Sequence, residues 1–378
     1  MKKYDVDYPA YILEQERFEK NISRICDVQQ RSGAKFLLAL KAFSLWRSFS
    51  MLTPYIKECT ASGPWEARLG HECLGGLSHT FSPAYNERDF SEVLLHSSHV
   101  IFNSIDQLNR FYQNCIDHTQ DISIGLRVNP GFSPVETDLY NPCVNGSRLG
   151  ISELVMPKEL PSCVEGLHFH ALCESNSYDL EKTIHAFEGR YHDYLPQLKW
   201  VNMGGGHLVT HKDYDVDHLV ALIQRFKQKW NVEVYMEPGS AFAWETGVLV
   251  SNVVDVIDQG GVQTAILDVS FTAHMPDCLE MPYQPIVRGA SIKMVEDGFV
   301  YRLGGNSCLA GDYIGDWWFD KPIEIGDQIV FEDMIHYTTV KTTFFNGVKH
   351  PDLFLEEKSG HLQLLRRFSY EDYKNRMS

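Results

Sequence analysis

Short apolar segments alternate with amphipathic ones through the first two thirds of the chain. Residues 36–43 (FLLALKAF) are almost continuously apolar, a pattern typical of a parallel strand that is covered on both faces. Segments of the same character predict further strands at residues 58–63, 75–79, 99–104, 122–130, 165–173, 200–206 and 233–239. Together with the first, they make eight predicted strands.

Helical patterns lie between these strands. Residues 13–32 place apolar side chains at i, i+4 and i+7, as an amphipathic helix does. Ser104 and Gln107 form a capping box at the start of another predicted helix. A third helix is predicted from the apolar stripe of Leu219, Leu222, Ile223, Phe226 and Trp230. Eight strand–helix units from about residue 33 to residue 240 predict an α/β fold, a (β/α)8 barrel of the TIM type.

The pattern changes after Thr246. Valine-rich segments closed by Gly and Asp turns predict strands in GVLVSNVVDVID, TAILDVS, PIVRGASI, GFVYRL and DQIVFEDM. Residues 8–12 precede the first helix, and we expect them to belong to this β-rich part as well. The sequence thus predicts a barrel of residues 13–245 and a second, mostly β domain of residues 1–12 and 246–378, in keeping with roughly 150 residues per domain.

Composition excludes several classes of protein. Of the 378 residues 44% are hydrophobic and 22% charged, as in ordinary globular proteins, and no segment has the roughly 20 apolar residues that span a membrane. The net charge of -16 opposes binding to nucleic acid or anionic lipid and weakly favours a small cationic partner. Nine cysteines without a Cys-x-x-Cys pair indicate reduced thiols. We therefore expect a cytoplasmic protein.

The active site of such a barrel lies at the carboxyl ends of its strands. Lys41 closes the first strand, where apolar neighbours would lower its pKa, so it is a candidate Schiff-base amine. The alternative is a lysine that reaches solvent from a strand end. Gly204, Gly205 and Gly206 follow the seventh strand, and their N–H groups suit a phosphate. A plain tight turn is the alternative for the glycines.

Two further strand ends carry unusual residues. Glu237 precedes Pro238 and Gly239, which fix the chain in a turn, and is either a ligand for a cofactor ring nitrogen or a salt-bridged rim residue. His168 and His170 are two apart on the sixth strand and face one side, a spacing that metal ligands use. Barrel enzymes with such a metal pair usually carry it on the first strand, so we expect no metal. We expect a core histidine at 168 and a ring-stacking histidine at 170.

The unusual residues at the strand ends are more informative together than singly. A lysine, a phosphate cradle, a stacking histidine and a carboxylate are expected around one barrel mouth. Each of them alone has a plain structural alternative, but pyridoxal phosphate uses all four. The sequence therefore indicates pyridoxal 5'-phosphate as the cofactor.

Six motifs, in this order, resemble the fold type III pyridoxal-phosphate decarboxylases of the ornithine and diaminopimelate decarboxylase group, whose fold is like that of alanine racemase. LALKAF resembles the cofactor-lysine strand of the family, RVNPG (residues 127–131) its fifth-strand motif, MGGG its phosphate loop and EPG its ring-nitrogen turn. GNSCLAGD (residues 305–312) resembles its cysteine loop, and HYTTVKTTFFNG (residues 336–347) its Tyr and Phe-Asn-Gly segment. The resemblance covers nearly the whole chain.

The resemblance implies roles in cofactor binding. Lys41 would hold the cofactor covalently, Glu237 would keep its pyridine nitrogen protonated, and His170 would stack on its ring. The three glycines and the hydroxyl of Tyr337 would hold the phosphate. Without the resemblance, Tyr337 is equally well a core aromatic residue.

The resemblance also implies a shared site. Cys308 and Asp312 would enter the site from the partner subunit of a homodimer, and Cys308 would return a proton to the substrate Cα. Their plain alternatives are a small buried thiol and a turn residue.

Two departures from the family pattern bear on the substrate. Ser240, expected to face the substrate, follows EPG where ornithine and diaminopimelate decarboxylases have Arg, and Leu309 replaces an acidic residue after the loop cysteine. The segment of residues 271–285 resembles members that act on carboxynorspermidine. There His274, Asp277 and Glu280 would face a cationic polyamine chain, unless they are solvated loop residues.

The sequence thus predicts a carboxy-lyase that uses pyridoxal phosphate to remove the α-carboxylate of carboxynorspermidine or carboxyspermidine, giving norspermidine or spermidine. A diaminopimelate or ornithine decarboxylase is an alternative that Ser240 and Leu309 disfavour. A noncatalytic carrier of pyridoxal phosphate is an alternative of another class, which the second domain disfavours.

Overall fold

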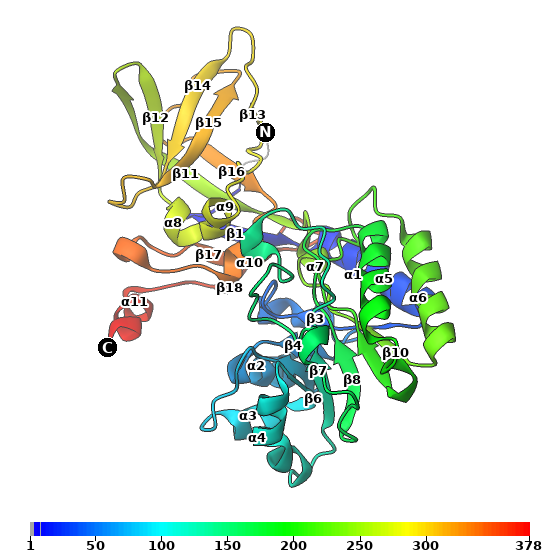
Figure 1. The fold of residues 1–378 in the computed structure, drawn as a ribbon. Coiled ribbons are helices and arrows are strands. Elements are labelled where there is room, and N and C mark those ends of the chain that lie inside the picture. Colours follow the sequence, from blue (N-terminus) through cyan, green and yellow to red (C-terminus); the bar gives the residue numbers. More distant parts are fainter. Residues whose placement is uncertain (1–3, 8) are drawn as a thin grey trace. The chain divides into compact units, whose positions relative to one another are not determined.

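The computed structural model describes residues 4–7 and 9–378 (Figure 1). Its backbone divides into two compact units. One is Asn21–Phe242, and the other joins the chain up to Lys20 with Ala243–Ser378. Tyr8, the first residue of the segment predicted to join the β-rich domain, lies outside the described residues.

The first unit is built around a closed parallel sheet. Its strands are β2 (Lys35–Phe36), β3 (Leu38–Ala39), β4 (Cys59–Ala61), β5 (Ser78–Phe81), β6 (Ser97–Phe102), β7 (Ser123–Arg127), β8 (Val164–His168), β9 (Trp200–Asn202) and β10 (Glu233–Met236). β2 and β3 are two pieces of the predicted first strand, interrupted at Leu37. Since β2 pairs with β10 and β3 with β4, the sheet closes on itself. The predicted (β/α)8 barrel is confirmed.

The strands are shorter than the apolar segments that predicted them. β8 ends at His168, not at residue 173, and β9 ends at Asn202, not at residue 206. The residues that follow form the turns at the barrel mouth. One boundary was wrong for a different reason: Gly75 does not begin a strand but ends helix α2 (Pro64–Leu74) in the left-handed conformation. Glycine is the usual residue at that helix end.

Helices follow most of the strands. They are α1 (Gln15–Ser32), α3 (Phe90–Leu95), α4 (Ile105–Ile116), α5 (Ser177–Tyr191), α6 (Val216–Trp230) and α7 (Ser240–Ala243), with 3₁₀ turns at Trp46–Met51, Asp138–Tyr140, Glu153–Val155 and Leu195–Gln197. Ser104 caps α4 by accepting the N–H of Gln107 at 3.1 Å. The Gln107 side chain accepts the N–H of Asn103, one residue earlier than in the predicted capping box. Ser104 therefore begins the helix as its sequence predicts.

The second unit is mostly β (Figure 1). Its strands are β1 (Ala10–Glu14), β11 (Gly247–Gln259), β12 (Val262–Leu267), β13 (Ala290–Ser291), β14 (Phe299–Gly304), β15 (Tyr313–Phe319), β16 (Gln328–Glu332), β17 (Asp352–Glu356) and β18 (Leu362–Arg366). Short helices α8 (Phe271–His274), α9 (Pro276–Glu280) and α10 (Tyr337–Val340), a 3₁₀ turn at Phe345–Gly347 and the terminal α11 (Tyr370–Met377) complete it.

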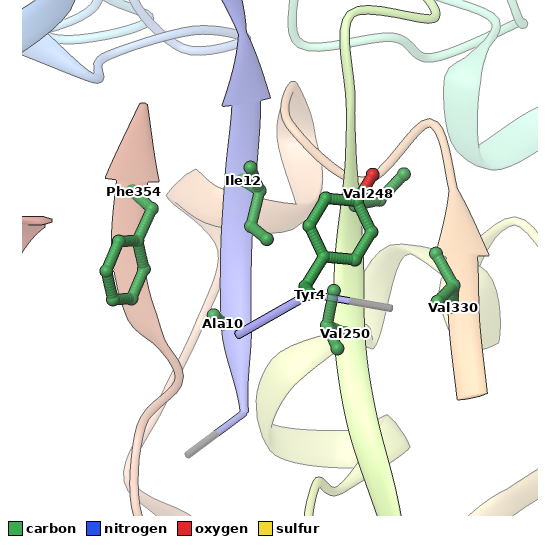
Figure 2. Packing of buried hydrophobic residues seen from close by; sticks show 7 residues of the cluster. All are labelled: Tyr4, Ala10, Ile12, Val248, Val250, Val330 and Phe354. Atoms are coloured by element: carbon green, nitrogen blue, oxygen red, sulfur yellow. The ribbon is translucent and has the colours of Figure 1, made fainter. Parts of the chain in front are cut away.

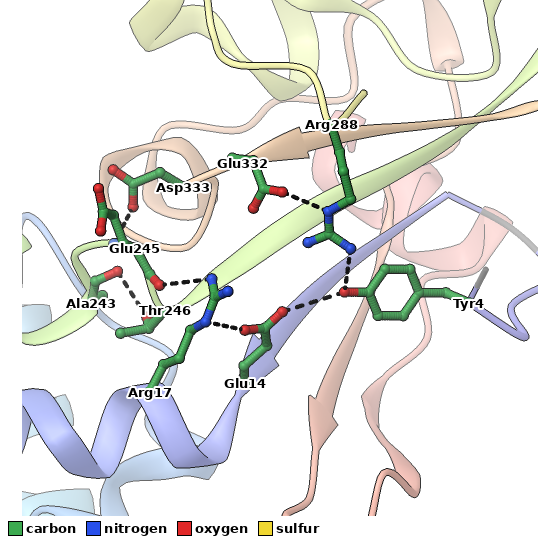
Figure 3. A network of polar contacts seen from close by, with 9 residues as sticks. All are labelled: Tyr4, Glu14, Arg17, Ala243, Glu245, Thr246, Arg288, Glu332 and Asp333. Atoms are coloured by element: carbon green, nitrogen blue, oxygen red, sulfur yellow. Dashed lines mark hydrogen bonds and ion pairs between the residues drawn. The ribbon is translucent and has the colours of Figure 1, made fainter. Parts of the chain in front are cut away.

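Strand β1 lies between two strands from the far end of the chain. It pairs antiparallel with β11 and parallel with β17. Figure 2 shows its apolar side chains in a buried cluster of Tyr4, Ala10, Ile12, Val248, Val250, Val330 and Phe354. Figure 3 shows a polar network beside it, in which Arg288 donates to the hydroxyl of Tyr4, Tyr4 donates to Glu14, and Glu14 pairs with Arg17. Tyr4 and strand β1 are thus an integral part of the β unit.

Candidate active site

A pocket opens at the carboxyl ends of the barrel strands, where small-molecule sites of such barrels lie. Its lining residues come from the last positions of the strands or the turns after them: Lys41, Thr60, Ala61, Ser62, Phe81, Arg127, His168, His170 and Glu237. The structure therefore brings together Lys41, His170 and Glu237, which the sequence had placed on three different strand ends.

Lys41 and His170 are in contact. Lys41 Nζ lies 3.3 Å from His170 Nε2, and the backbone N–H of Gly205 donates to His170 Nδ1 at 2.8 Å. A backbone N–H can only donate, so Nδ1 carries no proton and the proton of the neutral ring is on Nε2. Lys41 Nζ then accepts from Nε2, which requires an uncharged amine. The glycine turn thus fixes the tautomer of His170 and favours the nucleophilic form of Lys41.

Local electrostatics support the same protonation states. The Lys41 side chain is open to the pocket, but the surrounding protein desolvates its amine and lowers its pKa, an effect opposed by Glu237 and reinforced by Arg127. Desolvation also holds the pKa of His170 well below its ordinary value, and Lys41 and Arg127 add to this. Both shifts are toward the neutral form, which is the form in which a lysine is nucleophilic.

Glu237 is a buried carboxylate, 7% exposed, at the pocket wall. Asn202 Nδ2 donates to its Oε1 at 2.7 Å, and His168 Nε2 lies 3.6 Å from its Oε2. Burial alone would raise the pKa of Glu237, but His168, Asn202 and Lys41 outweigh it and lower the pKa to about 2. A permanently ionised carboxylate is suited to holding a proton on a neighbouring ring nitrogen.

Arg127 was not singled out from the sequence, yet it is part of the pocket. Its guanidinium lies 4.5 Å from the ring centroid of Phe81 and donates to the carbonyl of His170 at 3.2 Å. Burial lowers its pKa to about 10. Asn202 was missed as well. A charged or amide side chain at the end of an apolar strand is the sequence signal that both of them share.

The glycine turn is tightly packed. Gly204 and Gly206 are left-handed, with φ of 69° and 84°, and a side chain at any of the three glycines would clash with backbone. The N–H of Gly204 donates to Asn202 Oδ1 at 2.9 Å, and that of Gly205 donates to His170. Two of the three predicted phosphate donors therefore already have acceptors within the protein. Tight packing by itself explains why glycine is needed here.

In the β unit, the cysteine loop is closed by Asp312. Cys308 is exposed, and its N–H donates to Asn346 Oδ1 at 2.8 Å. Asp312 is buried and accepts from the hydroxyl of Ser270 and from the N–H groups of Thr272 and Ser307 at 3.0–3.1 Å. Its carboxylate thus anchors the loop that carries Cys308.

The residues predicted to face a polyamine lie on short helices. His274 is fully buried, where its Nδ1 accepts the N–H of Ser270 and desolvation lowers its pKa to about 3. Asp277 and Glu280 both form ion pairs with Lys341, the former at 2.9 Å. Ser240, in the barrel unit, begins helix α7.

Tyr337 begins α10 and is half-buried. The contacts that these residues would make with cofactor, substrate or a second subunit remain predictions.

Other sequence expectations concern thiols, metals and membranes. All nine cysteines are free. Residues 4–7 and 9–378 contain no group of three or more His, Cys, Asp or Glu side chains that could hold a metal ion. No helix in that part of the chain has the length and apolar character needed to cross a membrane. His168, the predicted core histidine, is indeed buried beside Glu237.

Residues 10–335 match the model of the family described as pyridoxal-dependent decarboxylase, C-terminal sheet domain. A carboxyaminopropylagmatine decarboxylase of Synechocystis sp. is 48% identical over 98% of this chain and 95% of the relative. A carboxynorspermidine/carboxyspermidine decarboxylase of Campylobacter jejuni is 45% identical over 98% of both chains. The crystal structure of carboxynorspermidine decarboxylase from Campylobacter jejuni, complexed with norspermidine, has a TM-score of 0.91 at 44% identity and covers 98% of this chain and 100% of its own. The chain belongs to the pyridoxal-dependent decarboxylase family.

Pyridoxal phosphate is the cofactor of this family, and the pocket fits it. The pocket offers a lysine amine whose pKa is lowered toward the neutral form that attacks an aldehyde, and a buried carboxylate anion, which suits a protonated ring nitrogen. Arg127 adds a buried cation to the same wall. Lys41 and Glu237 were predicted from the sequence, and the structure brings them to one pocket; Arg127 was not predicted.

Proposed function

We propose that this decarboxylase releases the α-carboxylate of carboxynorspermidine or carboxyspermidine as carbon dioxide and so forms norspermidine or spermidine. The observation that carries the proposal is the pocket that brings together Lys41, which contacts His170, and the ionised Glu237. Two relatives with the same name, 45% and 36% identical over nearly the whole chain, support the choice of substrate. Their substrates have one α-carboxylate on a long cationic chain.

The cofactor, when bound, supplies the electron sink for the carbon dioxide leaving group. Lys41 would hold it covalently, His170 would lie against its ring, and Glu237 would keep its ring nitrogen protonated. Because Gly204 and Gly205 already use their N–H groups, the N–H of Gly206 is the glycine donor we assign to the phosphate, together with the hydroxyl of Tyr337. The protein's part is thus to bind, orient and set protonation states.

We propose a homodimer in which Cys308 of the partner subunit returns a proton to the substrate Cα. Its exposure on a loop held by Asp312 and Asn346 supports a role in contact with another chain. Free thiols throughout support a reducing compartment, the cytoplasm. The Asp312 carboxylate has three donors of its own, so in this proposal it acts on the substrate side chiefly by holding the loop.

The polyamine chain would lie against Asp277 and Glu280. Their shared partner, Lys341, already places an ammonium group between them, which is the group that a polyamine presents. A substrate ammonium would exchange with that of Lys341. Ser240, lacking the guanidinium of an arginine, leaves no second carboxylate site, which disfavours diaminopimelate.

A second candidate substrate is carboxyaminopropylagmatine. The Synechocystis relative of that name, at 48% identity, favours it. Its far end is a guanidinium, which binds a pair of carboxylates by parallel hydrogen bonds, whereas an ammonium binds as a point charge. The Asp277 and Glu280 pair is compatible with either cation.

A substrate panel separates these proposals. Purified enzyme with pyridoxal phosphate would be given carboxynorspermidine, carboxyspermidine, carboxyaminopropylagmatine, diaminopimelate and ornithine, and carbon dioxide release would be measured. We expect carboxynorspermidine or carboxyspermidine to have the highest kcat/KM. Fastest turnover of carboxyaminopropylagmatine would transfer the proposal to that substrate, fastest turnover of diaminopimelate or ornithine would overturn it, and no release from any would favour a carrier.

Charge-neutral variants test the polyamine contacts. Asp277→Asn and Glu280→Gln should each raise KM for the preferred substrate by about tenfold, the effect of losing one partly solvated charged contact. The exposed Glu324→Gln, in the same unit, is the matched control and should leave KM unchanged. If all three variants have the KM of the wild type, Asp277 and Glu280 do not contact the substrate.

A further inference from the structure

Asn202 is a buried amide behind the pocket wall. It is the last residue of β9, has no exposed surface, and was read from the sequence only as part of an apolar strand. Its side chain makes two hydrogen bonds, one to the N–H of Gly204 at 2.9 Å and one to Glu237 Oε1 at 2.7 Å. It therefore touches both the glycine turn and the carboxylate.

The orientation of this amide is fixed by chemistry. The N–H of Gly204 can only donate, so the oxygen Oδ1 must face it, and Nδ2 must face Glu237. An ionised carboxylate can only accept, so Nδ2 donates to it. The alternative rotamer would place an oxygen against a carboxylate and two N–H groups against each other. Making both hydrogen bonds requires a side chain with one acceptor and one donor. An ionised aspartate lacks the donor, and leucine lacks both.

A third contact closes a ring. The backbone N–H of Glu237 donates to the carbonyl of Gly204 at 2.8 Å, so the turn after β9 and the turn after β10 are joined through backbone and through the Asn202 side chain. The second oxygen of Glu237 faces His168, which supplies no donor within 3.5 Å. Asn202 is therefore the hydrogen-bond donor that the structure gives to this buried carboxylate.

We propose that Asn202 is a positioning residue that couples the glycine turn to Glu237. The inference rests on the proposed function, in which the turn meets the cofactor phosphate and Glu237 meets the ring nitrogen. Both contacts would be made to one small molecule, so the spacing between turn and carboxylate would affect how well the two are made together. Asn202 sets that spacing and, together with His168, keeps Glu237 charged, without touching the cofactor itself.

Asn202→Asp is the sharpest test because it changes little in shape. The new carboxylate still accepts from Gly204 but faces Glu237 at hydrogen-bonding distance, where two ionised carboxylates repel each other and the pKa of one of them is raised. Apo protein would be titrated with pyridoxal phosphate between pH 5 and pH 8. We expect the variant to bind about 10- to 100-fold more weakly than wild type at pH 8, and to regain affinity as the pH falls and one carboxyl takes up a proton.

Asn129 provides a matched control. It follows β7 as Asn202 ends β9, and its Oδ1 accepts the N–H of the glycine two residues later, Gly131, at 2.8 Å. Its Nδ2 donates to the carbonyl of Pro142, not to a carboxylate. Asn129→Asp should therefore leave the pH dependence of pyridoxal phosphate affinity as in wild type, whatever it does to stability. The same dependence in both variants would overturn the coupling.

A double variant separates coupling from mere structural damage. In N202D/E237Q the roles are exchanged, since the new amide at 237 can donate to the new carboxylate at 202. We expect its apo form to melt at a higher temperature than N202D, although it carries one more substitution. Additive losses from the two substitutions would overturn the proposal.

Failure of the coupling and failure of the proposed function give different results. If Glu237→Gln alone keeps full decarboxylase activity, the assigned role of Glu237 in the reaction is wrong, yet rescue in the double variant would still establish the coupling. If Glu237→Gln abolishes activity but the losses in melting temperature are additive, the role of Glu237 in the reaction stands and the coupling through Asn202 is refuted.

Discussion

The barrel unit and the β unit present their candidate residues in contrasting ways. In the barrel, Lys41, His170 and Glu237 come from separate strand ends and converge on one pocket with perturbed protonation. In the β unit, Cys308 is exposed on a loop, and Asp312 is already satisfied by neighbours in its own unit. The barrel half is therefore preorganised for chemistry, whereas the β half is built to present a loop.

This contrast follows from architecture. A closed parallel sheet aims the ends of all its strands at one mouth, so residues far apart in sequence meet there. Antiparallel strands place their connections at both ends of a sheet, and each loop must stabilise itself. Asp312 does so for the loop of residues 305–312, where a side chain at Gly305 would clash with its carboxylate.

The strongest test of the barrel half is Lys41→Ala. Loss of the amine should lower kcat/KM by about 1,000-fold or more, roughly 4 kcal/mol of barrier, and abolish the absorbance of the bound cofactor. Carbon dioxide release and the absorbance spectrum would both be measured. Lys35→Ala is the control, because Lys35 lies at the opposite end of the same strand in a surface pair with Glu233. Substantial activity in Lys41→Ala would remove the lysine from the chemistry.

Mixed dimers test whether the β half serves a neighbour. Lys41→Ala and Cys308→Ala should each be nearly inactive, but a dimer of one chain of each has one site with both defects and one with neither. At statistical exchange half the dimers have one working site, so the mixture should recover about a quarter of wild-type activity. Activity would be assayed after exchange, confirmed with tagged copies. No recovery despite proven exchange would show that Cys308 acts in its own chain.

The glycine turn can be tested against a glycine elsewhere in the barrel unit. Gly206→Ala meets the carbonyl of Leu172 and a φ of +84°, so we expect at least about 4 kcal/mol of lost stability, or loss of folding. Gly189→Ala, inside helix α5, has nothing within 4 Å and should stabilise by about 0.5–1 kcal/mol. Urea unfolding measures both. A mild effect of Gly206→Ala would contradict the packing described for the turn.

Buried histidines predict the pH dependence of the barrel. Burial lowers the pKa of His207 to about 4, so as the pH falls below about 6.5 the unfolded chain takes up a proton before the folded one does. That stability is lost on acidification, by about 2 kcal/mol at pH 5. His207→Gln should remove this part of the loss, seen in urea unfolding at pH 7.5 and pH 5. The prediction is refuted if wild type and His207→Gln lose the same stability between pH 7.5 and pH 5. His192→Gln, at an exposed histidine, is the control.

More of the barrel unit than of the β unit could be predicted from the sequence. Lys41 and Glu237 were found because a charge at the end of an apolar strand breaks the pattern around it. Asn202 was missed because one small amide in WVNM does not break that pattern, and its two partners are close only in the fold. Arg127 was missed although it ends an apolar strand with a charge; its partner ring, Phe81, is on another strand.

The β unit was less predictable because long-range pairing defines it. Strands β15, β17 and β18 were not predicted, because YIGDWWF, DLFLE and LQLLR lack clean alternation. β15 pairs with β14 and β18 with β17, each its neighbour in the chain, but β17 also pairs with β1 from the far end of the sequence. The pairing of Asp277 and Glu280 with Lys341, about 60 residues away, was equally invisible. Family motifs indicated which loops matter but not what holds them.

The placement of β1 gives synthesis an order of events. Ala10 pairs with Val250 and with Asp352, so its partners leave the ribosome 240 or more residues after it. At about 5–20 residues per second that delay lasts roughly 10 to 50 s. Throughout it the strand AYILE is an unpaired, apolar edge of the kind that promotes aggregation. The barrel residues emerge in the meantime, so β1 of the nascent chain is exposed to misassociation until its partner strands have been made.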